Sequence, residues 1–202
     1  MKACRIGAIL LAVTGFLSFP ASAADAEAGK SKSAVCGACH GVDGNSSNPA
    51  WPSLAGQHAS YVYKQLMDFK KGNRVNAQMT AMVANLSEAD MRDLGAFYES
   101  QAPKAVPFDG EKIANGENIY RGGITDTRVA ACMGCHSPSG LGNGPAGWPS
   151  LAGQHPEYIV AQLRAFKYGE RANDTGKMMR NVAERMSDME MESVAAYLAG
   201  IQ

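Results

Sequence analysis

Two short motifs of the form Cys-x-x-Cys-His constrain this chain more than any other feature. They are Cys36-Gly37-Ala38-Cys39-His40 and Cys132-Met133-Gly134-Cys135-His136, and they lie 96 residues apart. This spacing is the attachment signature of c-type haem, in which two thiols add to the haem vinyl groups and the next histidine binds the iron. The sequence therefore predicts two covalently bound haems. Their thioether cysteines would be Cys36, Cys39, Cys132 and Cys135, and their proximal iron ligands would be His40 and His136.

The N-terminal end is typical of a secretory signal peptide over residues 1–23. Lys2 and Arg5 precede an apolar stretch over 6–19 that is shorter than a membrane span, and Ala21-Ser22-Ala23 is a small-residue cleavage pattern. Cleavage there would also remove the fifth cysteine and leave none for a disulfide. Bacterial c-type haem is attached after export, so we expect the mature protein in the periplasm.

An internal repeat divides the remaining chain. The octamer Trp-Pro-Ser-Leu-Ala-Gly-Gln-His occurs at 51–58 and again, unchanged, at 148–155, within a longer pattern of matching residues. The offset grows from 97 to 100 residues toward the C-terminus, which indicates a short insertion near 173–177. We expect two tandem domains over 24–102 and 108–202, joined by a stiff, proline-bounded linker over 103–107.

Each half is predicted to be helical, so the fold class is all-α. Residues 59–71 have apolar side chains at helical spacing and are followed by Gly72. Ser87-x-x-Asp90 and Ser187-x-x-Glu190 resemble capping boxes that begin amphipathic helices. Segments 41–52 and 137–149 are rich in Gly, Asn, Ser and Pro, so they are expected to be loops around the haems.

The charge balance favours protein partners over nucleic acid. Without Lys2 and Arg5 the chain has 17 basic and 19 acidic residues, a formal charge of −2, and the haem propionates would make it more acidic. We expect modest, salt-screened docking with redox proteins.

The sixth iron ligand would separate a carrier from a haem enzyme. His58 and His155 lie at predicted helix starts, where a polar helix-end role is the main interpretation and iron ligation the alternative. Methionine is the better candidate, because Met79 and Met179 occupy matching positions between the two last helices of each half. Such ligation would raise the reduction potential relative to two histidines and would close the iron to substrates.

Other methionines fit a ligand role less well. Met82 matches a valine in the other half and Met178 matches a glutamine, while Met91 and Met191 lie within the last helices and are predicted to be core.

The chain resembles the dihaem cytochrome c4 family over essentially its whole mature length. The resemblance is carried by 36–41, 54–57 and 78–80 in the first half and by 134–136, 151–155 and 179–180 in the second. It implies two class I cytochrome c domains related by pseudo-twofold symmetry, with Met79 and Met179 as axial ligands. It also implies that Pro52 and Pro149 orient the proximal histidines.

The resemblance further implies a periplasmic one-electron carrier, often loosely associated with the membrane. It would take electrons from a quinol-oxidising complex and pass them to a terminal oxidase, commonly of the cbb3 type. One departure concerns the first helix of each half. Gly116 and Tyr120 match the family's glycine–aromatic pair, but Gly29 is followed by Ser33, so packing there should be looser or filled differently.

Three other functions fit less well. A dihaem peroxidase needs an openable iron and a longer chain, and an electron-input subunit of a larger dehydrogenase or oxidase would copurify in fixed stoichiometry. Zinc or thioredoxin-like chemistry is disfavoured because both Cys-x-x-Cys pairs are followed by His within a helical repeat.

Overall fold

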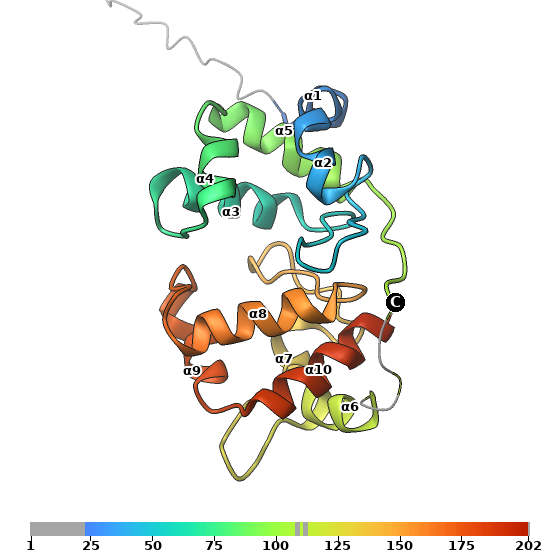
Figure 1. The fold of residues 1–202 in the computed structure, drawn as a ribbon, viewed down its shortest axis with the longest axis vertical. Coiled ribbons are helices and arrows are strands. Elements are labelled where there is room, and N and C mark those ends of the chain that lie inside the picture. The colour runs from blue at the N-terminus through green and yellow to red at the C-terminus, as the bar shows by residue number, and fades with distance from the viewer. Residues whose placement is uncertain (1–22, 108–109, 111–112, 202) are drawn as a thin grey trace, which may run out of the picture.

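A computed structural model describes residues 23–107, 110 and 113–201, and the predicted signal peptide up to residue 22 lies outside these residues. The first half consists of α1 (Ala26–Lys32), the 3₁₀ turn η1 (Ser33–Val35), α2 (Gly37–His40), α3 (Ala59–Lys71), α4 (Ala77–Val83) and α5 (Glu88–Glu99). The second half consists of α6 (Ile113–Gly122), α7 (Met133–His136), α8 (Pro156–Lys167), the 3₁₀ turn η3 (Thr175–Lys177), α9 (Met178–Ala183) and α10 (Asp188–Gly200). The two halves stack one above the other (Figure 1).

The predicted all-α class is confirmed. In the described ranges the only β pairing is two isolated bridges, Ile124 with Val129 and Asn143 with Trp148. The first bridge closes a hairpin between α6 and α7 that has no counterpart between α1 and α2. The insertion predicted near 173–177 forms η3, where Gly176 and Lys177 adopt positive φ.

Local sequence signals place several helix ends. Both predicted capping boxes are present, with the Ser87 and Ser187 side chains accepting from the backbone N–H three residues on. Gly72 ends α3 in the left-handed conformation, and Pro156 is the first residue of α8. These caps use only neighbouring residues, so they are independent of the rest of the fold.

A glycine allows the first and last helices of each half to cross closely. A Cβ on Gly29 would lie 2.0 Å from the backbone oxygen of Asp93 on α5, and a Cβ on Gly116 would lie 2.0 Å from that of Ser193 on α10. No side chain fits at these two positions without moving a backbone. Each half is therefore built on the same α1–α5 or α6–α10 crossing.

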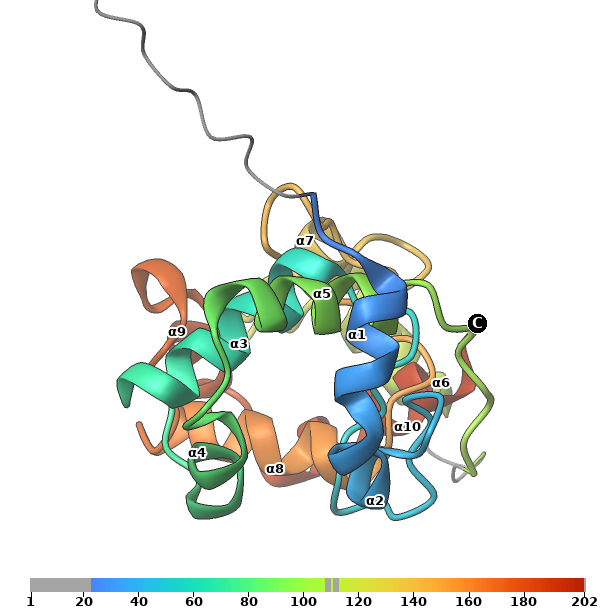
Figure 2. The same cartoon turned by 90° about the horizontal axis from the view of Figure 1, so that it is seen from above.

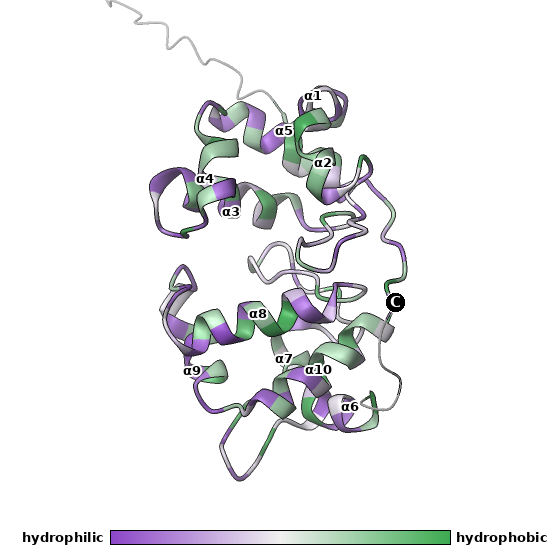
Figure 3. Cartoon of the chain, viewed as in Figure 1, coloured by the Kyte–Doolittle hydropathy of each residue, from purple (hydrophilic) through white to green (hydrophobic). Residues whose placement is uncertain are grey.

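The core of each half lies beneath its last helix. Met91 and Met191 are fully buried, as predicted for core residues, and residues 193–199 of α10 are all buried. Figure 3 shows α10 coloured as hydrophobic toward its C-terminal end. Burial of these apolar side chains, at roughly 25 cal/mol per Å², holds the helices around the motif loops.

The linker over 103–107 is held against the first half. The Asn45 side chain donates to the carbonyl of Ala102 and accepts from the backbone N–H of Lys104, at 3.1 and 2.8 Å. The Lys104 ammonium also pairs with Asp43, and Val106 is buried. Among the described helices, none is long and apolar enough to cross a membrane.

Candidate functional site

The two Cys-x-x-Cys-His motifs form the single-turn helices α2 and α7. In each, the histidine N–H bonds the carbonyl of the first cysteine at 2.9 Å, which brings thiols and imidazole to one end of the turn. No disulfide joins the four motif cysteines. Gly41 and Ser137 end the turns at positive φ, and at Gly41 a Cβ would lie 2.2 Å from the Asn45 carbonyl.

Each motif histidine is buried and held in one orientation. His40 and His136 are 7 and 8% exposed, and their Nδ1 atoms lie 2.8 and 3.0 Å from the carbonyl oxygens of Pro52 and Pro149. A carbonyl can only accept, so Nδ1 carries the proton and Nε2 keeps its lone pair. Burial lowers the pKa of both imidazoles, although these hydrogen bonds oppose the shift. A neutral imidazole fixed through its other nitrogen is the form that binds a metal.

A single cavity of about 620 Å³ reaches both motifs. Seen from above, α1, α3, α4 and α5 of the first half are arranged in an open ring (Figure 2). The walls of the cavity are mostly apolar and include both motif histidines, Met79 and Met179, both cysteines of the first motif and the first cysteine of the second, together with Trp51 and Trp148. An apolar cavity with paired thiols, a fixed imidazole and a thioether in each half fits two covalently bound haems.

The structure distinguishes between neighbouring methionines. Met79 and Met179 are half-buried in the wall and packed against the core of their own halves. Met82 and Met178 line the same cavity but are 53 and 44% exposed. The Asn76 side chain caps α4 by accepting from the Met79 N–H at 3.0 Å, so Met79 lies in the capped first turn of this short helix. The geometry favours Met79 and Met179 as the distal thioethers.

The thiols do not have the properties of a redox dithiol. Burial raises the pKa of Cys36, and it raises that of Cys132 to about 11. Reactive Cys-x-x-Cys pairs depend on a lowered thiol pKa. The first cysteine of each motif therefore lacks the lowered thiol pKa that thiol–disulfide exchange requires.

A tyrosine ring lies beside the first cysteine of each motif but comes from a different helix in each half. In the second half it is Tyr120 on α6, whose hydroxyl donates to the Ser137 carbonyl at 2.6 Å. In the first half, where Ser33 replaces that tyrosine, the ring is Tyr98 on α5. Tyr98 packs on Phe97 at 5.1 Å and Tyr120 packs on Tyr197 at 5.4 Å. The gap expected at Ser33 is thus filled differently, by the last helix.

The repeated octamer forms part of the contact between the halves. The Gln57 side chain donates to the carbonyl of Ser150 and accepts from its N–H, at 2.9 and 3.0 Å. Gln154 makes the same pair of bonds with Ser53, both at 2.9 Å. The two glutamines are therefore related by the pseudo-twofold symmetry of the molecule.

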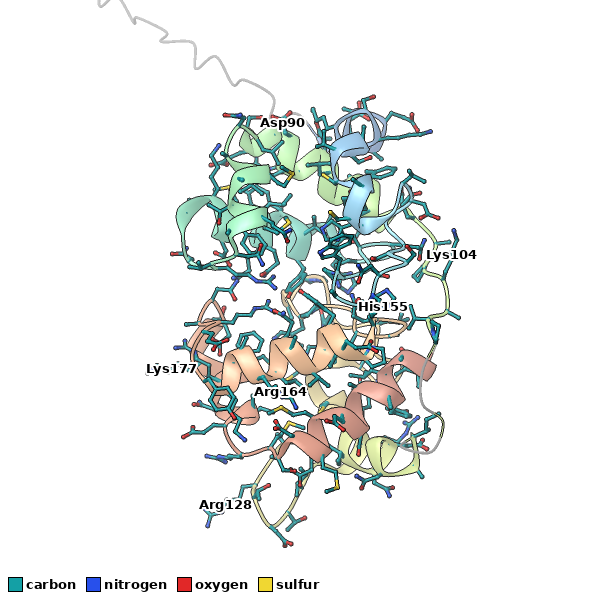
Figure 4. All side chains as sticks on the ribbon, viewed as in Figure 1. Asp90, Lys104, Arg128, His155, Arg164 and Lys177 are labelled. Carbon is teal, nitrogen blue, oxygen red and sulfur yellow. The ribbon has the colours of Figure 1, made fainter. Side chains whose placement is uncertain are left out.

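The octamer histidines are also contact residues. Nε2 of His58 lies 2.8 Å from the Leu141 carbonyl, and Nε2 of His155 lies 2.8 Å from that of Ser46. His155 lies between the two halves in Figure 4. Both histidines occupy the N-cap positions of α3 and α8, as the helix-end interpretation predicted, but their side chains bond the opposite half instead of capping the helix. The identity of the two octamers was the signal that could have indicated a symmetric contact.

Comparisons with known proteins agree with this site. The family model described as Cytochrome c matches residues 26–102 and 113–202. The chain is 42% identical to cytochrome c4 of Azotobacter vinelandii, over 95% of this chain and 96% of that protein. It is 37% identical to a thiosulfate dehydrogenase electron acceptor of Stutzerimonas stutzeri, over 92 and 90% of the two chains.

A solved structure shows the same arrangement of two domains. The crystal structure of reduced cytochrome c4 from Pseudomonas stutzeri superposes with a TM-score of 0.86 at 44% identity, covering 89% of this chain and all of that one. Two matched cytochrome c segments imply two covalently bound haem c groups in an electron-transfer protein rather than an enzyme. The chain therefore belongs to the dihaem cytochrome c4 family.

Proposed function

We propose that this protein is a periplasmic carrier that moves single electrons through two haems with closed iron sites. Cys36 and Cys39 would attach the first haem, and Cys132 and Cys135 the second. His40 and Met79 would be the axial iron ligands in one half, and His136 and Met179 those in the other. When bound, the haem iron supplies the one-electron couple Fe(III)/Fe(II).

The observation that carries this proposal is the matched set of ligands around one shared cavity. Pro52 and Pro149 accept from the histidines' Nδ1–H, which fixes each imidazole plane and adds electron density at Nε2. A methionine thioether opposite favours the reduced state and leaves no position for a substrate. Because the ligands of both halves line the same cavity, an electron could pass between the haems without leaving the protein.

The partners are proposed on family grounds. We infer that a quinol-oxidising complex reduces the protein and that a terminal oxidase, such as one of the cbb3 type, oxidises it. The signal-like N-terminus supports export to the periplasm, and peripheral attachment to the membrane is compatible with this role.

A second candidate function has a specific observation in its favour. The chain is 37% identical to proteins named as electron acceptors of thiosulfate dehydrogenase. The protein would then take electrons from a dehydrogenase. This role corresponds to the alternative of an electron-input subunit of a larger dehydrogenase or oxidase. Stopped-flow reduction by a quinol-oxidising complex and by thiosulfate dehydrogenase, in parallel, would distinguish the two donors.

The ligand assignment is tested by single substitutions in the haem-loaded protein. Met79→Ala and Met179→Ala should each remove half of the weak red-edge absorption that marks methionine-ligated ferric haem. Met82→Ala, which removes an exposed methionine beside Met79, is the matched control and should leave the spectrum unchanged. Full absorption in both variants would contradict the assignment.

A further inference from the structure

Two arginines at equivalent repeat positions lie in the wall of the shared cavity. Arg74 follows α3 and Arg171 follows α8, and each lies two residues after a glycine. Each guanidinium stacks on the phenylalanine of its own half, 4.7 Å from the Phe69 ring centre and 4.5 Å from that of Phe166. Arg171 is only 7% exposed.

Each arginine is held by the opposite half of the molecule. Arg74 donates to the Tyr158 hydroxyl on α8 at 2.9 Å, and Arg171 donates to the Tyr61 hydroxyl on α3 at 2.8 Å. The side-chain oxygen of Gln162 accepts from both arginines, at 2.7 and 2.8 Å. The oxygen of Gln65 also accepts from both, at 2.8 and 3.2 Å. The two guanidinium groups thus form one crossed network.

The network holds positive charge without a carboxylate of its own. The acceptors named above are neutral oxygens, as is the Asn173 side-chain oxygen bound to Arg171. Two nearby carboxylates pair with other cations, Asp68 with Lys64 at 2.5 Å and Asp174 with Arg180 at 2.7 Å, and Asp174 acts on Arg171 through its charge rather than through a hydrogen bond. A buried cation that no carboxylate contacts is strongly destabilising. The arginine charges also lower the pKa of Tyr61, against the effect of its burial.

We propose that Arg74 and Arg171 bind the propionate carboxylates of the two haems as a crossed pair of positioning residues, which couples the two redox sites. The inference rests on the proposed function, because haems in this cavity bring the carboxylates that the guanidinium groups lack. Planar guanidinium groups match carboxylates with two parallel hydrogen bonds. Because each arginine is fixed by the other half, a change at one haem is transmitted to the other.

The test is a haem-resolved redox titration followed by NMR of the haem methyl signals. Removing a nearby positive charge favours the ferric state, so Arg171→Gln should lower the midpoint potentials of both haems. A tenfold change in the reduced-to-oxidised ratio corresponds to about 59 mV for one electron. Arg171→Lys keeps the positive charge, so its midpoint potentials should stay close to the native values. This variant is also less prone to misfolding than Arg171→Gln.

Two controls keep the outcome decisive. Arg164→Gln removes an exposed arginine of α8 that pairs with Asp188, and it should shift neither potential because solvent screens it. Tyr61→Phe, in the first half, should weaken the hold on Arg171 and alter the potential of the second haem.

Three results would overturn the proposal. The first is that the Arg171→Gln and Arg164→Gln variants have equal midpoint potentials. The second is that the midpoint potentials of the native protein depend on chloride or phosphate concentration, which would identify a solvent anion as the counter-ion. An effect of Tyr61→Phe confined to the first haem would exclude the crossing. If the native spectrum lacked two methionine-ligated haems, the proposed function itself would fail, which the spectrum reports independently of the arginine variants.

Discussion

Tyr98 and Tyr120 occupy similar places beside a motif cysteine, but their hydroxyl groups have different surroundings. The Tyr120 hydroxyl donates to the Ser137 carbonyl at 2.6 Å. The Tyr98 hydroxyl is buried beside Cys36 and makes no hydrogen bond of normal geometry within the described residues. Burial raises the pKa of both phenols, so both remain neutral.

This difference predicts that replacement of each tyrosine by phenylalanine affects the free energy of unfolding differently. Tyr120→Phe should lower the free energy of unfolding by about 1–2 kcal/mol, because it leaves a buried carbonyl without its donor. Tyr98→Phe should change it little or raise it slightly. Denaturant unfolding of the two haem-loaded variants checks this, and equal losses would show that the Tyr98 hydroxyl has a partner in the holoprotein.

An ion pair at the linker gives a pH-dependent contribution with a definite sign. Hydrogen bonds from the Lys104 ammonium, which has the largest effect, and from the Asn45 N–H lower the pKa of Asp43 from 3.8 to about 2. The folded pKa lies below the unfolded one, so the contribution is present above pH 3.8 and is lost as the pH falls through about 2. The side chains of Lys104 and Asp43 are 68 and 35% exposed, so solvent screens the pair and its contribution to stability is small.

The pair is tested by carboxyl NMR. Lys104→Met should raise the pKa of Asp43 toward its usual value, incompletely because the Asn45 N–H remains. Lys30→Met on α1 removes a lysine from elsewhere on the first half and should leave the Asp43 titration unchanged. An unaltered Asp43 pKa in Lys104→Met would show that the ion pair does not form in solution.

Residue-level features differ in how far they could be predicted. The methionine pair could be selected because an internal repeat supplies a second copy of each site, and the structure places both in the cavity wall. The sequence could not show that the Tyr98 ring takes the place of the aromatic side chain missing at Ser33, because Tyr98 belongs to a helix more than 60 residues away. The sequence showed only that an aromatic side chain was missing.

At the scale of elements, the helix crossings depend on one glycine in each half. Gly29→Ala and Gly116→Ala would place a methyl group 2.0 Å from a backbone oxygen of α5 or α10, and backbone cannot rotate away as a side chain can. We expect each substitution to lower the free energy of unfolding by at least about 1–3 kcal/mol, the usual effect of overpacking. Chemical denaturation followed by far-UV circular dichroism measures this.

A matched control lies on the same helix as Gly116. At Gly122 a Cβ would meet nothing within 4 Å, so Gly122→Ala should leave stability unchanged or slightly higher through better helix propensity. Similar stabilities for Gly116→Ala and Gly122→Ala would contradict the close crossing.

The helices themselves were largely predictable, whereas their contacts were not. α3, the two capping boxes and the start of α8 follow from residues within one turn of each other. The hairpin closed by Ile124 and Val129 was missed. It has no equivalent in the first half, so the internal repeat offered no second copy of its pattern for comparison. Periodicity indicates which segments are helical but not which backbones meet.

At the scale of the whole molecule, the two halves are joined by polar groups that both copies of the repeat supply. The histidines of the octamer bond carbonyls 83 and 109 residues away. Such contacts have no local signal, which is why a helix-end role was the simpler interpretation. The octamer is unchanged in both halves because each copy meets the other across the pseudo-twofold axis.

The two glutamines of this contact provide the sharpest test of the assembled fold. Gln57 satisfies the N–H and carbonyl of Ser150, and Gln154 satisfies those of Ser53. Truncation leaves both backbone groups unpaired at a buried contact, at about 1–3 kcal/mol for each unsatisfied group. Gln57→Ala and Gln154→Ala should therefore loosen the contact and separate the unfolding of the two halves, seen as two calorimetric transitions where the native protein has one.

A charge variant distinguishes the hydrogen bonds from simple packing. Gln57→Glu keeps the shape and the acceptor for the Ser150 N–H but cannot donate to the Ser150 carbonyl, so its effect should approach that of Gln57→Ala. Gln101→Ala is the control, because the Gln101 side chain bonds only within the end of α5 and the residue after it. If Gln57→Glu behaved like the native protein while Gln57→Ala did not, side-chain volume rather than hydrogen bonding would hold the halves together.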